Sequence, residues 1–215
     1  MGRQELANKV TAQTRAFSRL SALILKLTLA FVSIPLIISL TVSFRDRLSS
    51  LGGNSSQCFF YGIISYIILH FFIYRPISFY RRGQLILRFL FGFFSPLVKV
   101  APYLLPIYSI LVISCFLILK LAFSLNPGAN IFLFFISSSL TFHLVITAEE
   151  LRDKEVGLAR ANYFFGFTII YLVNILMLAA GLHFMFDKFS FLEFLSQAGS
   201  GSLVIYQNIF RQLFA

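Results

Sequence analysis

The sequence predicts an all-α polytopic membrane protein with about five transmembrane helices and with amphipathic interfacial helices at the N-terminus and the C-terminus. Only 12% of the residues are charged, whereas charged residues make up about 25% of a soluble domain. The apolar residues fall into five long runs separated by short polar stretches. Most of the basic residues flank these runs, which is typical of membrane proteins.

The N-terminal region, residues 1–19, is polar and basic, and its apolar residues recur at near-helical spacing. This pattern predicts an amphipathic cytoplasmic helix that lies on the membrane. A solvated extension is the alternative. The first span follows at 21–44, where Pro35 predicts a kink. This apolar run is too long for a signal-peptide core, so we expect an uncleaved span.

Four further apolar runs complete a predicted transmembrane domain over residues 20–188. A charged connector of helical composition, "EELRDKEVGLAR", separates the last two runs. Each run has a length close to that needed to cross the hydrocarbon layer. The predicted spans are about 58–74, 100–123, 131–148 and 163–186.

The C-terminal tail, residues 189–215, contains the polar, Gly-rich stretch "SQAGSGS". We expect this stretch to divide the tail into two short apolar pieces, "FSFLEFL" and "LVIYQNIFRQLF". Neither piece is long enough to cross about 30 Å of hydrocarbon. The tail is therefore predicted to be interfacial or periplasmic, or to lie against a partner.

The placement of Lys and Arg predicts the orientation. Twelve basic residues lie in the N-terminal region and in the two loops on the same side of the membrane, and five lie on the other side. Lys26 lies inside the first span and is not counted. The positive-inside rule then predicts a bacterial inner-membrane protein with a cytoplasmic N-terminus and a periplasmic C-terminus. The net charge of +10 is explained by this flanking pattern, so we expect membrane lipids with anionic headgroups as partners and no nucleic acid.

The segment "FYRRGQLILRFLFGFF", residues 79–94, combines arginines with bulky apolar side chains. It predicts an amphipathic helix at the cytoplasmic face, with phenylalanines entering the membrane and arginines reaching lipid phosphates. The predicted headgroup contacts are Arg75, Arg81, Arg82, Arg88 and Lys99.

Ionisable and polar residues inside spans each require a partner, because the hydrocarbon layer offers none. His70, His143 and Glu149 are weak candidates for a metal site, but no His-x-x-x-His or Glu-x-x-His spacing supports one. We therefore expect no metal, no cofactor and no catalytic residue. The predicted interhelical polar contacts are Ser138, Thr141, His143 and Asn174.

Four phrases in order resemble a known family. They are "YRPISFY" at 74–80, "APYLLPIY" at 101–108, "SLTFHLVIT" at 139–147 and "IYLVNIL" at 170–176, and "FSFLEFL" also fits. Over about residues 20–195 the chain is similar to bacterial membrane proteins related to the intramembrane zinc metallopeptidases of the site-2-protease type. In that family the first phrase runs into a His-Glu-x-x-His helix.

The resemblance implies the family's fold with an inactive site. Aligning Gly83 with the family's glycine puts Gln84, Leu85 and Arg88 where the family has His, Glu and His. Gln is a poor zinc ligand, Leu cannot accept a proton, and Arg repels a cation.

We therefore expect a non-catalytic protein that serves as a structural or accessory subunit of a larger inner-membrane complex. One alternative is a degenerate or unorthodox metalloprotease that uses His70, His143 and Glu149 or Glu150. The other is a small transporter or lipid-handling protein that uses the Ser/Thr stripe of the fourth span.

Overall fold

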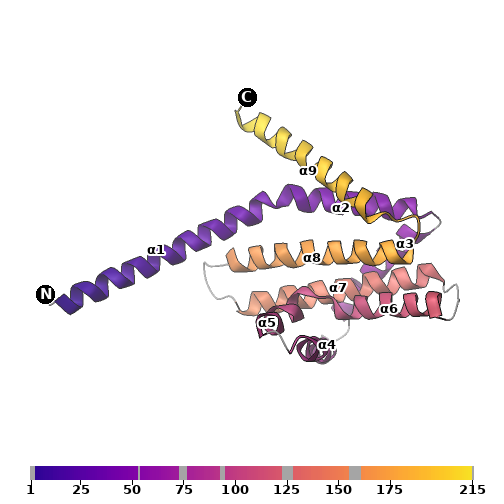
Figure 1. Cartoon of the computed structure of the whole chain (residues 1–215), viewed down its shortest axis with the longest axis horizontal. Helices are drawn as coiled ribbons and strands as arrows, with labels where there is room; N and C mark the ends of the chain where they lie inside the picture. Colours follow the sequence, from indigo (N-terminus) through magenta and orange to yellow (C-terminus); the bar gives the residue numbers. More distant parts are fainter. Residues whose placement is uncertain are drawn as a thin grey trace.

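The computed structural model describes residues 3–52, 54–72, 77–92, 95–122, 128–154 and 161–214. This part of the chain is helical and contains no strand, so the all-α prediction is confirmed (Figure 1). The helices are α1 (Arg3–Val32), α2 (Ile34–Ser50), α3 (Ser55–Phe72), α4 (Ile77–Leu90), α5 (Ser95–Leu104), α6 (Ile107–Ala122), α7 (Ala129–Lys154), α8 (Ala161–Met185) and α9 (Phe191–Phe214).

Four helical stretches are long and apolar enough to cross a membrane, which confirms the polytopic prediction. They correspond to the first, second, fourth and fifth predicted spans. Helix α6 is apolar but has only 16 residues, which is about 24 Å at the α-helical rise. The four stretches are Gln13–Ser50, Ser55–Phe72, Ala129–Asp153 and Asn162–Met185.

The predicted third span, 100–123, is wrong in its first turns. The chain there forms the end of α5, leaves the helix at Leu105 and Pro106, and then forms α6. Pro106 has no backbone N–H to donate, and a residue that precedes proline avoids the helical conformation. Pro106 therefore divides one apolar run into two helices, whereas Pro102 lies within α5.

Helices α1 and α2 together contain the predicted first span. They are separated by Ser33 alone, and Pro35 lies in the first turn of α2. Figure 1 shows a bend at this junction, where the sequence predicted a kink. Because α1 runs without interruption from Arg3, no break separates residues 3–19 from the span; whether they lie on the membrane stays a prediction.

The bundle helices alternate in direction, as consecutive membrane crossings require. Ser109 of α6 meets Ser139 of α7, and further along α6 Phe116 meets Phe132 with ring centroids 5.1 Å apart, so these two helices are antiparallel. Helices α3 and α7 are parallel, because Ser55 meets Asn130 near their starts and His70 meets Glu149 near their ends. They are also very close, because a Cβ atom at Gly62 would overlap the Phe134 carbonyl and the Ser137 hydroxyl. A glycine at such a crossing lets two backbones approach, as is common between membrane helices.

Two apolar clusters form the interior. The larger one contains residues of α2, α3, α6, α7, α8 and α9. Its aromatic centre includes Phe44, Phe59, Phe189 and Phe194. The smaller one lies where α4 crosses the bundle and contains Tyr66, Tyr80, Phe142 and Ile146.

The expected division of the tail into two pieces is wrong, because α9 is one continuous helix of 24 residues. The hydroxyls of Ser200 and Ser202 donate to the carbonyls of Gln197 and Gly199, so these polar groups find partners inside the helix. Hydrogen bonds of this kind allow serine within a helix whose tertiary contacts are favourable.

Helix α9 runs antiparallel to α2 and does not remain at the end of the bundle where α8 finishes. Arg47 pairs with Glu193 near one end of the contact, and the Tyr206 hydroxyl donates to the Val32 carbonyl near the other. Between them, the Ser39 hydroxyl donates to the Ala198 carbonyl at 2.7 Å.

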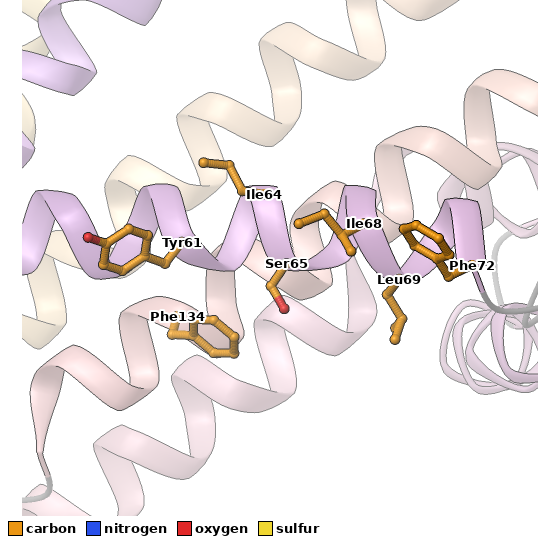
Figure 2. A pocket seen from close by; sticks show the side chains of 7 residues that line it. All are labelled: Tyr61, Ile64, Ser65, Ile68, Leu69, Phe72 and Phe134. Atoms are coloured by element: carbon orange, nitrogen blue, oxygen red, sulfur yellow. The ribbon is translucent and has the colours of Figure 1, made fainter.

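Large apolar side chains are exposed on the outside of the bundle, where a bilayer would place hydrocarbon. One face of α3 forms an open groove of about 450 Å³, to which α7 contributes Phe134 (Figure 2). Its other lining residues are Tyr61, Ile64, Ser65, Ile68, Leu69 and Phe72.

Candidate functional site

The candidate site lies where α4 meets the last turns of α7. Figure 1 shows α4 end-on beside helices that are seen lengthwise, so α4 crosses the bundle. Its buried face consists of Tyr80, Gly83, Gln84 and Leu87. A Cβ atom at Gly83 would lie only 2.8 Å from Cγ2 of Ile107, so glycine permits the close crossing with α6.

Hydrogen bonds from aromatic hydroxyls fix α4 in place. The Tyr80 hydroxyl lies 2.7 Å from Oγ1 of Thr147 on α7. Burial raises the pKa of Tyr80 to about 12, so the hydroxyl stays neutral under physiological conditions. The Tyr108 hydroxyl donates to the Phe79 carbonyl at 2.5 Å, and these two rings stack with centroids 4.8 Å apart.

A polar pocket of about 530 Å³ opens beside this crossing. Gln84 is buried, and its Nε2 donates to Oε2 of Glu150 at 3.3 Å. The three positions that the resemblance aligns with His-Glu-x-x-His all line the pocket. The lining residues are Arg81, Gln84, Leu85, Arg88, Tyr103, Glu150 and Asp153.

The predicted metal candidates do not form one cluster. Nε2 of His70 lies 3.5 Å from Oε1 of Glu149, whereas Nε2 of His143 lies 3.2 Å from the Tyr103 carbonyl. His143 and Glu149 are six residues apart on α7, which turns them toward different sides of the helix. Within the described ranges, no three His, Cys, Asp or Glu side chains are grouped so that they could hold a metal ion.

The predicted interhelical residues behave in two ways. Asn174 donates from Nδ2 to the Leu104 carbonyl of α5 at 3.0 Å, and His143 also contacts α5. In contrast, the Thr141 hydroxyl donates at 2.8 Å to the Ser137 carbonyl of its own helix. Ser138 is half-buried on α7, and no interhelical hydrogen bond to it is found among the described residues.

Several contacts at the site escaped the sequence analysis. The Ser109 and Ser139 hydroxyls meet at 2.9 Å between α6 and α7, and Tyr80 meets Thr147. Thr147 and Glu150 are three residues apart on the face of α7 that meets α4. This i, i+3 spacing is the one sequence signal that could have indicated a polar face there.

The arginines predicted to contact headgroups are exposed on α4 where they can be described. Arg81 and Arg88 lie on the face that borders the pocket, and Arg82 lies on another face. Arg75 and the side chain of Lys99 lie outside the described residues.

Comparison with protein-family models, curated proteins and solved structures gives no match for this chain. The similarity to site-2-protease-type proteins therefore stays a prediction from its sequence phrases. Inferences about function therefore depend on the chemistry of the pocket and on the exposed faces of the helices.

Proposed function

We propose that this chain is a non-catalytic membrane protein and serves as a structural or accessory subunit of a larger bacterial inner-membrane complex. The observation that carries the proposal is the apolar stripe on the outer half of α9. This stripe consists of Leu203, Tyr206, Phe210 and Leu213, which recur at helical spacing.

The two halves of α9 have different surroundings. Phe194, Ala198 and Ser202 are buried against the bundle, whereas 64% of Phe210 is exposed and Leu213 is similarly open. Figure 1 shows the C-terminal end of α9 extending away from the bundle. Gln207 and Arg211 border the apolar stripe on one side, and a helix with such a polar side is poorly suited to lipid on all sides. A protein partner that covers the stripe would leave the polar side of α9 exposed to water.

The chemistry of the pocket supports a non-catalytic role. Gln84 is engaged by Glu150, and the His143 ring contacts a backbone carbonyl. The guanidinium of Arg88 faces the pocket and would oppose a bound metal cation. These polar groups connect α4, α5 and α7 to one another.

The proposal is tested by extracting the full chain from its native membrane in mild detergent and measuring the mass of the particle. We expect a stoichiometric complex with another integral membrane protein. Substituting Phe210→Ala together with Leu213→Ala should release the chain from it. The matched control, Gln207→Ala with Gln212→Ala, changes polar residues of the same half-helix and should leave the complex intact. A lone monomer of the unaltered chain would contradict the proposal.

The Lys and Arg distribution supports a cytoplasmic N-terminus as part of this proposal. The start of α9 then lies at the periplasmic face, where α8 ends. The expected periplasmic C-terminus depended on a tail of two short pieces. Because α9 instead follows α2 as one helix, we do not retain that expectation.

A second candidate function, an unorthodox metalloprotease, is favoured by one observation, the contact of 3.5 Å between His70 and Glu149. Elemental analysis of the purified full chain tests it. One equivalent of zinc that disappears in His70→Ala would support the metalloprotease. An unaltered protein without zinc after purification in zinc-supplemented buffer would rule against it.

A further inference from the structure

We propose that the polar pocket beside α4 binds the headgroup of a zwitterionic phospholipid with a primary ammonium, of the phosphoethanolamine type. The pocket presents two arginines on one wall and two carboxylates on the other. This inference concerns a lipid site and does not depend on the subunit proposal.

The cationic wall comes from the spacing of residues on α4. Arg81, Gln84, Leu85 and Arg88 recur at i, i+3, i+4 and i+7, so they share one helix face, and all four line the pocket. Arg81 and Arg88 therefore point to the same side, two turns apart. Guanidinium groups bind phosphate oxygens through paired, charge-assisted hydrogen bonds, which makes this wall suited to a phosphodiester.

The anionic wall comes from the last turns of α7, where Glu150 and Asp153 are three residues apart. Glu150 accepts one hydrogen bond from Gln84 and retains further lone pairs for a cation. Asp153 pairs at 3.5 Å with Arg152 of its own helix. In the part of the chain that the structure describes, no ion pair joins the arginines of α4 to Glu150 or Asp153. Separated charges of both signs thus face one cavity, as a zwitterionic ligand requires.

The polar lining favours a primary ammonium over a quaternary one. A primary ammonium offers three hydrogen-bond donors to carboxylate and amide oxygens. A trimethylammonium group offers none and is usually held in a cage of several aromatic rings. Tyr103 is the aromatic residue among those lining the pocket, beside two carboxylates and an amide. A phosphoglycerol headgroup carries a phosphodiester but no cation, so it would leave Glu150 and Asp153 without an opposite charge.

The surroundings of the pocket favour a lipid over a soluble phosphoethanolamine. Leu85 lines the pocket with 61% of its surface exposed, and Phe89, one turn further along α4, is 87% exposed. These side chains offer an apolar border for the glycerol and acyl parts of a lipid. The pocket volume of about 530 Å³ also falls within the range of roughly 300–1,000 Å³ that is usual for ligand sites.

Native mass spectrometry of the purified full chain with equimolar ethanolamine, choline and glycerol phospholipids tests this proposal. We expect the ethanolamine lipid to bind preferentially and soluble phosphoethanolamine not to displace it. Arg88→Gln and Glu150→Gln should each weaken its binding about tenfold, because each removes a charge-assisted hydrogen bond. Arg82→Gln, on another face of α4, and Asp187→Asn, in an exposed turn, are the matched controls.

Equal binding of the three lipids would overturn the proposal, and so would a preference for the glycerol lipid. An equal loss in Arg82→Gln would also overturn it, because the arginines would then act as a diffuse basic surface. Displacement by soluble phosphoethanolamine would show a free headgroup compound as the ligand instead of the lipid. Circular dichroism checks that each variant keeps its helical content, so that lost binding is not lost folding.

Discussion

At the residue scale, Tyr80 connects α4 to the bundle through its hydroxyl. This residue is almost fully buried, and its hydroxyl meets that of Thr147, which is also buried. Since Thr147 has little access to water, removing its partner leaves a polar group poorly satisfied. The neighbouring Gln84 depends on the position that Tyr80 gives to α4 for its contact with Glu150.

We expect Tyr80→Phe to destabilise the protein by about 1 kcal/mol, the usual net contribution of a hydrogen bond between neutral groups. Thermal unfolding in detergent, followed by circular dichroism, measures the effect. Tyr61→Phe is the matched control, because Tyr61 lies on the open face of α3. Equal unfolding temperatures for Tyr80→Phe and the control would show that the hydroxyl contact does not contribute.

The raised pKa of Tyr80 predicts a pH dependence. Burial raises it from its ordinary value of 10.0 to about 12, so folding favours the neutral phenol. The stabilising effect is full below about pH 10 and is lost as pH rises through about 12. The unaltered protein should therefore lose more stability than Tyr80→Phe across this interval in the same unfolding assay. Parallel profiles of stability against pH for the two proteins would contradict the assignment of this pH dependence to Tyr80.

At the element scale, single glycines set how closely helices approach. A methyl group at Gly62 would overlap the backbone of α7, whereas a methyl group at Gly199 of α9 would meet nothing within 4 Å. The two glycines are both helical and differ in what faces them. Gly62 therefore serves the crossing of α3 with α7, and Gly199 has no packing role among the described residues.

Gly62→Ala is expected to destabilise the protein by about 1–3 kcal/mol, because the added methyl forces two backbones apart. Gly199→Ala should be neutral or stabilise α9 by up to about 1 kcal/mol, since alanine favours helix. Thermal unfolding of both variants checks this pair. A milder effect at Gly62 than at Gly199 would refute the close crossing of α3 and α7.

At the scale of the whole molecule, the direction of each helix determines which residues share a membrane face. Helices α3 and α7 are parallel, and α6 and α7 are antiparallel. The pocket beside α4 thus lies near the end of the bundle where α3 and α7 finish. The turn after α8, which contains Asp187, lies at the opposite end of the bundle, because Asp187 meets Lys120 in the last turns of α6.

The proposed orientation predicts which sites a membrane-impermeant maleimide can reach. In a chain whose two cysteines are replaced by alanine, Asp187→Cys should be labelled from the periplasmic side, because Asp187 is 98% exposed. Gln13→Cys, exposed on α1, should be labelled only after the membrane is permeabilised. The reverse pattern would invert the topology, and labelling of both sites in sealed cells would refute a cytoplasmic N-terminus.

The sequence by itself determined the helical class, four of the spans and the bend near Pro35, because these follow from local composition and backbone chemistry. It also indicated α4 as an amphipathic helix, since Arg81, Gln84 and Arg88 recur at helical spacing. The hydrophobicity of a span and the effect of a proline on the backbone depend on residues that are close in the sequence, so both can be predicted from the sequence alone.

Only the tertiary structure decided that α9 is continuous, that α4 borders a pocket, and that His70 meets Glu149 while His143 meets α5. The glycines and serines of "SQAGSGS" predict a break, but in the fold Gly201 makes room for Ser39 of α2 and the serines bond within α9. Such outcomes depend on residues far apart in the chain, whose packing outweighs a local preference of about 1 kcal/mol per residue.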